Sequence, residues 1–418
     1  MRWDEDDTTS SDSSRRRSSD SGSSSSWGIS SNTSSTDDDE DLQAQEAPPP
    51  NSFSGLSYVL LAVVLAAAVG LALYLASEGG GENSTSESSG GGNGGGKTGT
   101  SKASGATKTA TSTGRAAPAA TTVGADFLAS LAQKYSMTPV ATSSLAMPSS
   151  AIASPSAAMS WIKDTWKPIK GDSDYISFPT DPLDSSNEEV VMQVEYEKGS
   201  YSSGKGGVMN LQMGVFGSGK NRAMASWEVG FNEGFDFVKG GKLPGLYGGD
   251  PASFCTGGTG SEKCFSLRLM WRENGQGEVY AYIPQYPGQC SEDDSSSTAY
   301  CHGADGISFE RGSFTFQAGV YNTVTEVAIL NSDIDTANGV LALYAGETLA
   351  FELTDVVFRV NSSVQFSAFA ISSFFGGSTD DYAASAECYS YFRQMRFWEG
   401  DDASTESGAT VTASIVTR

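Results

Sequence analysis

Five polar side chains in the middle of the chain are of types that can move a proton and stabilise negative charge. They are one lysine in FVKGGKLPGL, a Ser-x-Arg pair and a Tyr-x-Tyr pair, namely Lys242, Ser266, Arg268, Tyr280 and Tyr282. A phenol has a pKa of about 10 in water, and neighbouring cations favour its phenolate, so a tyrosine beside them becomes a usable base. Fixed cations also stabilise an anion that develops during a reaction. The set predicts proton-transfer chemistry if the fold brings it together.

The stretch FSLRLMWRENGQGEVYAYI predicts a β-hairpin that holds four of these residues, because large apolar residues occupy every second position on both sides of a polar turn. A two-residue turn at Asn274 and Gly275 would set Arg268 opposite Ala281 and mix the apolar and polar rows. A three-residue loop, with Gly275 in the left-handed bulge position, instead sets Arg268 opposite Tyr280. The burial pattern favours this second register. It predicts a core face of Phe265, Leu267, Leu269, Trp271, Val279, Ala281 and Ile283, and an opposite face on which Ser266, Arg268 and Met270 meet Tyr282, Tyr280 and Glu278.

The hairpin belongs to a predicted all-β domain over residues 160–400. Short runs such as VVMQVEY, VMNLQMGVF, SFTFQAGVY and VQFSAFAI are each bounded by Gly, Asn, Asp or Ser, which is typical of strands and turns. This number of strands suits one β-jelly roll, a two-sheet antiparallel sandwich. Between residues 161 and 400 there are 16 lysines and arginines against 31 aspartates and glutamates, so a polyanion would be repelled unless a cleft focuses positive charge. Residues 401–418 are predicted to be disordered.

The first 159 residues read as a membrane-anchored stalk. Residues 1–54 are rich in Ser, Asp and Glu and predict a disordered cytoplasmic tail. Residues 55–76 contain an uncharged apolar run that is long enough for one transmembrane helix. Residues 77–159 are mostly Gly, Ser, Thr and Ala and predict a flexible tether, in which 127–137 could form a short helix. The sequence therefore predicts a single-pass membrane protein.

The positions of the cysteines indicate the orientation of this predicted membrane protein. All five cysteines follow the apolar run, and four form two close sequence pairs, as disulfide-closed loops do; the alternative is that they are unpaired small hydrophobic residues. Sequons at Asn83 and Asn361 agree with a glycosylated carboxyl-terminal part. We therefore expect the amino terminus inside and the folded domain in the lumen or outside the cell. The expected pairs are Cys255 with Cys264 and Cys290 with Cys301, which leaves Cys388 free.

The combination of the KLPGL segment, Ser-x-Arg and Tyr-x-Tyr resembles polysaccharide lyase family 14, which includes alginate and glucuronate-polymer lyases. The closing segment FFGGSTDDYAASAECYSYFRQMRFW is similar to the end of the fungal members, so the resemblance covers most of residues 185–398. It implies a β-jelly roll that cleaves a uronic-acid polysaccharide by β-elimination. It also implies that the substrate cleft is lined by Lys242, Ser266, Arg268, Tyr280 and Tyr282.

Elimination from a uronate removes the C5 proton beside an ionised carboxylate. Because a second negative charge develops there, cations are needed to stabilise it. Lys242 or Arg268 would stabilise the developing enolate. Tyr280, opposite Arg268, is the predicted base or combined base and acid. Tyr282 is its predicted helper, and Ser266 is expected to donate a hydrogen bond to the sugar or its carboxylate.

Two other functions fit parts of the pattern. A catalytically silent carbohydrate-binding domain would keep the tyrosines as platforms for sugar rings, and a sandwich-type glycoside hydrolase would need two suitably spaced carboxylates, for which we find no strand motif. His302, the single histidine, follows Cys301 in a polar loop and is expected at the surface. We expect no cofactor, no metal site and no nucleic-acid partner, and we expect the membrane-anchored lyase to be a monomer.

Overall fold

The structure is a computed structural model that describes residues 117–118, 122–140, 145–186, 188–202, 204–253, 255–293 and 298–417. The predicted cytoplasmic tail, membrane span and first part of the tether lie outside these residues. Among the described residues, no helix has the length and apolar character needed to cross a membrane.

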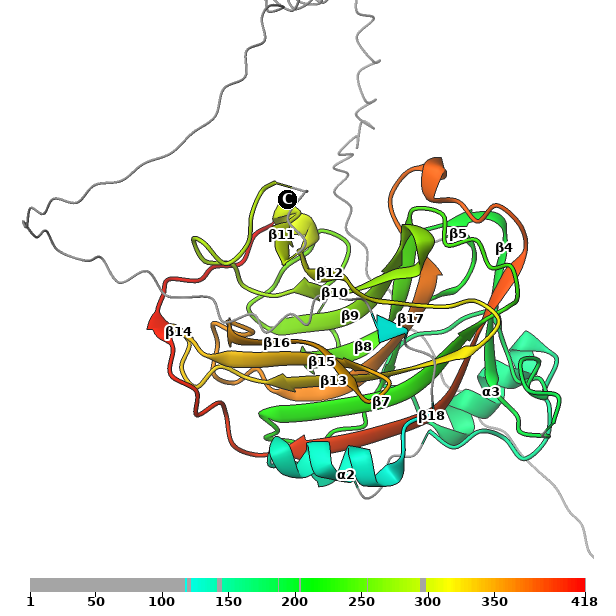
Figure 1. Cartoon of the computed structure of the whole chain (residues 1–418), viewed down its shortest axis with the longest axis horizontal. Coiled ribbons are helices and arrows are strands. Elements are labelled where there is room, and N and C mark those ends of the chain that lie inside the picture. Colours follow the sequence, from blue (N-terminus) through cyan, green and yellow to red (C-terminus); the bar gives the residue numbers. More distant parts are fainter. Residues whose placement is uncertain are drawn as a thin grey trace, which may run out of the picture. The chain divides into compact units, whose positions relative to one another are not determined.

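Two facing sheets form an all-β sandwich, consistent with the predicted jelly roll (Figure 1). Their strands pair antiparallel, except for β1 with β12. The first sheet has the order β1 (Ala117–Pro118), β12 (Ile307–Thr315), β10 (Gln276–Tyr282), β9 (Cys264–Arg272), β8 (Gly240–Gly249), β17 (Phe366–Phe375) and β6 (Val208–Met213), with β11 (Ala299–Cys301) beside β12.

The second sheet has the order β16 (Thr348–Val356), β15 (Gly339–Ala345), β13 (Tyr321–Ile329), β7 (Arg222–Phe231), β18 (Cys388–Gly400), β4 (Met192–Tyr201) and β3 (Ile176–Ser177). Two short strands flank it, β2 (Thr138–Pro139) beside β18 and β5 (Gly204–Gly206) beside β4. In each sheet, one strand lies between two partners that both precede it by more than a hundred residues. β17 separates β8 from β6, and β18 separates β7 from β4.

The predicted hairpin is β9 and β10, and its register is confirmed. Arg268 pairs with Tyr280, and Ser266 pairs with Tyr282. The loop Glu273–Gly275 joins the strands, and Gly275 has a φ angle of 75°, which glycine adopts without strain. The apolar row is buried as predicted, with exposed fractions of 0–7% for Phe265, Leu267, Leu269, Trp271, Val279, Ala281 and Ile283.

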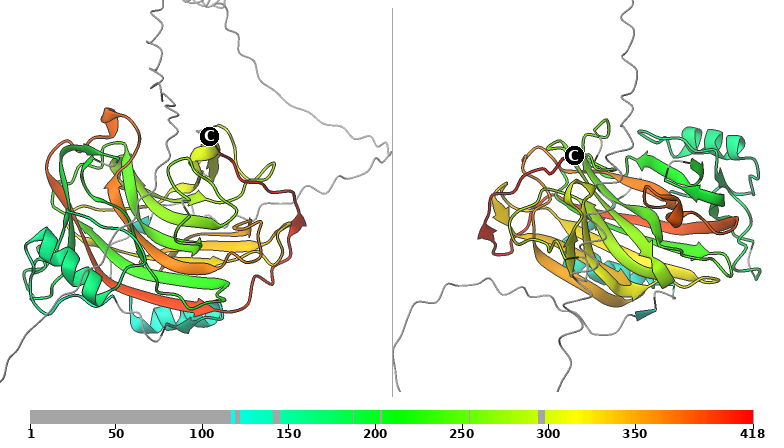
Figure 2. Two further views of the ribbon diagram at one scale, coloured as in Figure 1. Left: turned by 180° about the vertical axis from the view of Figure 1, so that it is seen from behind. Right: turned by 90° about the horizontal axis from the view of Figure 1, so that it is seen from above.

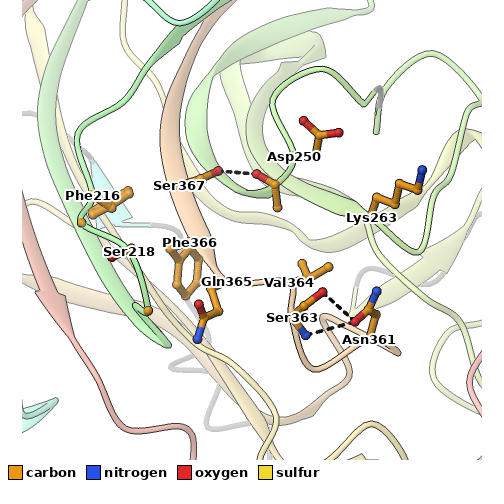
Figure 3. A pocket seen from close by; sticks show the side chains of 13 residues that line it. Phe216, Ser218, Asp250, Lys263, Asn361, Ser363, Val364, Gln365, Phe366 and Ser367 are labelled. Atoms are coloured by element: carbon orange, nitrogen blue, oxygen red, sulfur yellow. Dashed lines mark hydrogen bonds between the residues drawn. The ribbon is translucent and has the colours of Figure 1, made fainter.

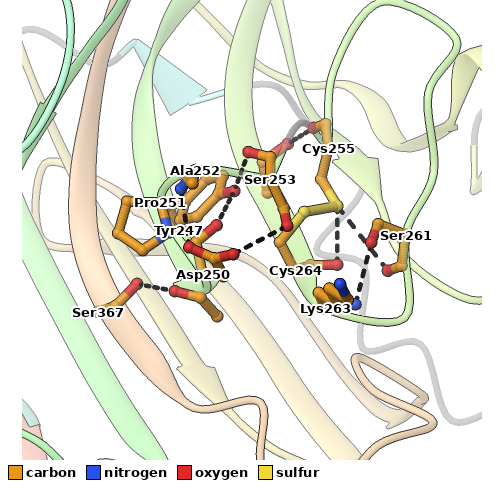
Figure 4. The surroundings of a disulfide bond; sticks show 12 residues. Tyr247, Asp250, Pro251, Ala252, Ser253, Cys255, Ser261, Lys263, Cys264 and Ser367 are labelled. Carbon is orange, nitrogen blue, oxygen red and sulfur yellow. Dashed lines mark hydrogen bonds between the residues drawn. A yellow bond between two sulfur atoms is a disulfide. The ribbon is translucent and has the colours of Figure 1, made fainter.

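The opposite face of the hairpin is also buried, which the alternation of residue types did not predict. Arg268 is 3% exposed, Tyr280 is 6% exposed and Glu278 is fully buried. The loop that precedes β9 contacts this face, and it is closed by the Cys255–Cys264 disulfide (Figure 4). Both predicted disulfides, Cys255–Cys264 and Cys290–Cys301, are confirmed, and Cys388 is free and buried.

Two helices lie within the predicted tether, so ordered structure begins well before residue 160; the first overlaps the short helix expected at 127–137, and the second was not predicted. The helix α2 (Ala125–Lys134) covers the outer face of the second sheet (Figure 2), where Leu128 and Leu131 pack with Val327. The helix α3 (Pro155–Thr165) buries Ala158, Met159 and Ile162. Each helix places its apolar residues on one face, and burying that face offsets the cost of ordering the chain.

The prediction of disorder after residue 400 is wrong for residues 401–417. The Arg222 guanidinium donates hydrogen bonds to the carbonyl oxygens of Asp402 and Ala403, at 2.8 and 3.0 Å. The strand β19 (Ala409–Thr410) then pairs with β14 (Thr336–Ala337). Backbone hydrogen bonds join Ser414 and Gln285 in both directions, at 2.8 and 2.9 Å. These contacts hold the segment, drawn in red in Figure 1, along the domain.

Candidate active site

Three neighbouring strands bring the predicted site residues onto one face. In β8, β9 and β10, Lys242 pairs with Met270, and Arg268 pairs with Gly245 and Tyr280. The Lys242 Nζ atom lies 3.6 Å from the centroid of the Tyr280 ring. The ring centroids of Tyr280 and Tyr282 are 5.8 Å apart. The predicted gathering of lysine, arginine and tyrosines on one face is therefore present.

A bulge in β8 turns Lys242 onto this face. The pairing of β8 with β9 shifts register between Lys242 and Gly245, because Pro244 lies there and has no N–H for a ladder hydrogen bond. Position 245 has room only for glycine, since a Cβ atom there would lie 1.9 Å from the carbonyl oxygen of Leu267. The KLPGL segment thus has a local geometric role: it distorts the strand so that its lysine faces the tyrosines.

The Lys242 amine is buried without a carboxylate partner in the part of the chain that the structure describes. Its side chain contacts the Met270 sulfur and the Tyr280 ring. Burial lowers the pKa of Lys242 well below its usual value, and the charges of Arg268 and Arg272 lower it further. Burial and the neighbouring cations thus favour the neutral amine, which is a base. The direction of this shift runs against the prediction that Lys242 supplies a cation.

The Tyr280 phenol shows the opposite shift from the one predicted. Burial raises its pKa above the ordinary value, Tyr282 raises it further, and the opposing effect of Arg272 is smaller. Tyr280 is therefore protonated in the free protein and is suited to donate a proton. The sequence placed a cation beside Tyr280 correctly, but it gave no measure of burial, which has the larger effect on the pKa.

The Arg268 guanidinium is a buried cation that no carboxylate neutralises among the described residues. It is 3% exposed, its Nε atom has no hydrogen-bond partner, and its Cζ atom lies 5.7 Å from the centroid of the Tyr282 ring. Burial lowers the pKa of Arg268, but an arginine keeps its charge in proteins. Leaving such a charge unpaired is costly, so the site is prepared to bind an anion, and the planar guanidinium matches a carboxylate.

Ser266 and Tyr282 hold the loop that the Cys255–Cys264 disulfide closes. The Ser266 hydroxyl donates a 2.6 Å hydrogen bond to the carbonyl oxygen of Cys255, and the Gly258 amide donates to the Tyr282 hydroxyl at 3.3 Å. Ser266 is fully buried, so its hydroxyl proton is used within the protein rather than toward a sugar. Both residues thus shape the wall of the site.

Breaking this disulfide should lower activity through those two contacts. We expect the double variant C255S/C264S to lose roughly 2–3 kcal/mol of stability, as for other short disulfide-closed loops. Its kcat should also fall below that of wild type at temperatures where both are folded. Initial rates and thermal unfolding would be measured for this variant and for C388S, which removes a buried thiol outside any disulfide. Unchanged kcat in C255S/C264S would show that the loop does not support the site.

The sequence placed Glu278 on this face without giving it a role, and it did not predict the arginines that contact Glu278. Glu278 accepts hydrogen bonds from Arg272 at 2.5 Å, Arg311 at 2.7 Å and the Ser308 hydroxyl at 2.9 Å. Burial would raise the pKa of Glu278, but the two guanidinium groups outweigh it and hold the pKa below the ordinary value. With Lys242 and Arg268, these arginines concentrate basic groups at one place in a domain that is acidic overall.

His302 was expected at the surface, but it is only partly exposed and lies beside Tyr280. Its Nε2 atom lies 2.8 Å from the Ser308 hydroxyl, and its ring centroid lies 5.3 Å from that of Tyr280. Burial, followed by the charge of Arg272, lowers the pKa of His302 to about 4, so the ring is neutral at physiological pH. The sequence feature that could have indicated this position is the Cys290–Cys301 pair, because His302 directly follows a cysteine that a disulfide holds in place.

A cavity of 410 Å³ lies apart from this site (Figure 3). It lies near Gly249, at the opposite end of β8 from Lys242. Its lining includes exposed side chains such as Asp250 and Lys263, and Asn361 on its rim accepts two hydrogen bonds from Ser363. None of the five predicted site residues lines this cavity.

Comparisons with known proteins identify the family. A sequence model described as Polysaccharide lyase 14 matches residues 184–395. The PL-14 alginate lyase from Aplysia kurodai is 31% identical, with 61% of this chain and 100% of that chain covered and a TM-score of 0.51. The alginate lyase vAL-1 from Chlorella virus is 21% identical (60% and 99% covered, TM-score 0.44). The endo-beta-1,4-glucuronan lyase from the fungus Trichoderma reesei is 10% identical (59% and 96% covered, TM-score 0.38).

A search of curated proteins gave no match. The family match nevertheless spans just over half of the chain and includes β8, β9 and β10 with their lysine, arginine and tyrosines. The chain therefore belongs to polysaccharide lyase family 14 and is a polysaccharide lyase.

Proposed function

We propose that this lyase cleaves a uronic-acid polysaccharide by β-elimination, with Lys242 as the base, Tyr280 as the acid and Arg268 as the carboxylate-binding group. The observation that carries the proposal is the buried, unpaired guanidinium of Arg268 on the same face as a lysine with a lowered pKa and a tyrosine with a raised pKa. Pairs of groups whose environments shift their pKa values in opposite directions are typical of acid–base sites.

The three roles follow from the chemistry of the reaction. The C5 proton of a uronate becomes removable when the charge of the carboxylate is neutralised. The planar guanidinium of Arg268 can neutralise it by donating two parallel hydrogen bonds. The neutral Lys242 amine takes the C5 proton, and the electron pair of the C5–H bond forms the C4–C5 double bond as the C4–oxygen bond breaks. The Tyr280 phenol gives its proton to the leaving oxygen. The Lys242 ammonium then returns a proton to the Tyr280 phenolate, which restores both groups.

The test is the product, because elimination and hydrolysis leave different ends. The folded domain would be incubated with alginate, glucuronan and related polymers while ultraviolet absorbance and reducing ends are followed together. Elimination creates an unsaturated uronate that absorbs, so both quantities should rise in proportion. Reducing ends without absorbance would show a glycoside hydrolase, and binding without either product would show a carbohydrate-binding domain.

Replacing Arg268 with glutamine should reduce kcat/KM by about a hundredfold or more, the scale seen when a preorganised electrostatic donor is removed. R268K should recover little of this loss, because an ammonium keeps the charge but lacks the planar fork. The matched control is K263Q, which removes a cation at the separate cavity and should keep wild-type kinetics. An R268Q enzyme with unchanged kcat/KM would exclude Arg268 as the carboxylate-binding group.

The placement of the enzyme in the cell is also a proposal. The two disulfides support folding in an oxidising compartment. The apolar run at residues 55–76 supports anchoring to a membrane, with the lyase domain on the lumenal or extracellular side. Protease protection of the domain in sealed membrane vesicles would test this orientation.

A further inference from the structure

A carboxyl group from the second sheet lies inside the apolar core between the sheets. Side chains of β13 alternate between the two faces, and Glu326 shares the core-facing row with Val324 and Ala328. Its direct partners on the neighbouring strands are Ala225 and Leu343, which are both fully buried. Glu326 itself has no exposed surface. By its position, this residue would be expected to be apolar.

The single hydrogen bond found for this carboxyl crosses to the first sheet. The backbone amide of Leu246 donates to the Glu326 Oε2 atom at 3.0 Å. The Oε1 atom has no hydrogen-bond partner in the described ranges. Burial raises the pKa of Glu326 well above its usual value, and the Leu246 amide opposes this only in part. The surroundings of this carboxyl therefore favour its neutral form.

The amide that donates this hydrogen bond belongs to the segment that positions Lys242. Leu246 is the first residue after the Pro244–Gly245 step, where the pairing of β8 with β9 shifts register. On its other side, β8 pairs with β17, and that register also shifts, between Ala370 and Phe374. Both ladders are thus interrupted beside Lys242, and the Glu326 hydrogen bond supports the backbone where they resume.

The energetics argue against a role in stability alone. A buried carboxylic acid with one unpaired oxygen costs free energy, whereas an apolar side chain of similar volume would fill the same space without that cost. Residues that break a local rule of burial at such a cost are expected near functional sites. Here the nearest functional feature is the bulge that faces Lys242 toward Tyr280.

We propose that Glu326 is a positioning residue: by accepting the Leu246 amide hydrogen bond across the core, it fixes the β8 bulge and with it the Lys242 amine. This proposal rests on the proposed function of Lys242 as the base. Glu326 does not contact the substrate face itself, since its side chain lies on the other side of the first sheet.

Two substitutions of similar volume separate the hydrogen bond from packing. Glutamine keeps an acceptor oxygen for the Leu246 amide, and methionine fills the same space without one. We expect E326Q to keep kcat close to wild type. We expect E326M to lower kcat by about tenfold to a hundredfold, as for a small misplacement of a catalytic group, while KM and the melting temperature stay equal to or above those of wild type. Equal kcat for E326M and E326Q would overturn the proposal.

A control variant and a measurement that does not depend on catalysis complete the test. V324A removes apolar volume from the same core row, so it should lower the melting temperature and leave kcat unchanged; a fall in kcat as large as that of E326M would overturn the proposal. The rate at which an amine-selective acylating reagent modifies Lys242, measured by mass spectrometry, should match wild type in E326Q and differ in E326M.

This readout also separates the two proposals. If K242M remains active but the acylation rate still differs between E326M and E326Q, the assignment of Lys242 as the base fails and the positioning by Glu326 stands. If the acylation rates of E326M and E326Q agree, the positioning by Glu326 fails, whatever the role of Lys242.

Discussion

Replacing Lys242 with methionine should lower kcat by roughly a hundredfold to ten-thousandfold, the contribution typical of a positioned general base. Methionine fills nearly the same volume beside Met270 and the Tyr280 ring, so the loss would come from the amine. Initial rates of absorbance increase would be compared with those of K239M. Lys239 precedes Lys242 by three residues, but it is exposed and pairs with Asp381, so K239M should keep wild-type activity.

The same substitution should stabilise the fold at neutral pH. The pKa of Lys242 in the folded state lies well below that in the unfolded chain, so unfolding takes up a proton between these two values. The free energy of unfolding of the wild type therefore rises with pH across this window. K242M lacks this dependence. The amount by which its free energy of unfolding exceeds that of wild type should therefore shrink as the pH approaches the ordinary pKa of lysine. Chemical denaturation at several pH values measures the difference, and a K242M protein that is active and less stable than wild type would contradict the assignment.

Replacing Tyr280 with phenylalanine should nearly abolish turnover while leaving binding and stability close to wild type. Phenylalanine keeps the ring that contacts the Lys242 amine and removes the hydroxyl that donates the proton. The expected loss in kcat is about a hundredfold or more, because one proton-transfer partner is missing. Turnover would be followed by absorbance, and binding would be measured by calorimetry with an oligosaccharide.

This experiment also separates an enzyme from a binding domain, since a phenylalanine ring stacks on sugars as well as a tyrosine ring does. The comparison variant is Y282F, which removes a hydroxyl that accepts a hydrogen bond from the Gly258 amide. Y282F should lose less activity than Y280F, because its hydroxyl supports a loop. An active Y280F enzyme with wild-type kcat would remove Tyr280 from the mechanism.

The hairpin could be predicted from the sequence because its information is local. Alternation with a period of two residues fixes which side chains share a face, and only the three-residue loop ending at Gly275 keeps the two apolar rows together. The confirmed pairing of Arg268 with Tyr280 follows from these two facts. The disulfides were predictable for the same reason, since each closes a short segment of the chain.

The protonation states of the site could not be predicted, because they depend on burial, which the alternation of residue types does not reveal. The position of Arg268 beside Tyr280 suggested a lowered tyrosine pKa, yet burial raises it. His302 reaches the site only because β11 pairs with β12, next to β10. The helix α3 was missed because its Ser-, Ala- and Pro-rich sequence resembles a linker, although one face of it is apolar.

The late position of β17 and β18 in the sequence has a consequence for how the enzyme folds. Each lies between two strands that precede it by more than a hundred residues, so neither sheet is continuous until these distant segments join it. Pairings of such long range form slowly. Until they form, β8, β6, β7 and β4 each have an unpaired edge, which exposes the partly folded chain to aggregation. Since β17 pairs directly with the strand that contains Lys242, we expect catalytic activity to be among the last properties recovered on refolding, after most of the β-structure has formed.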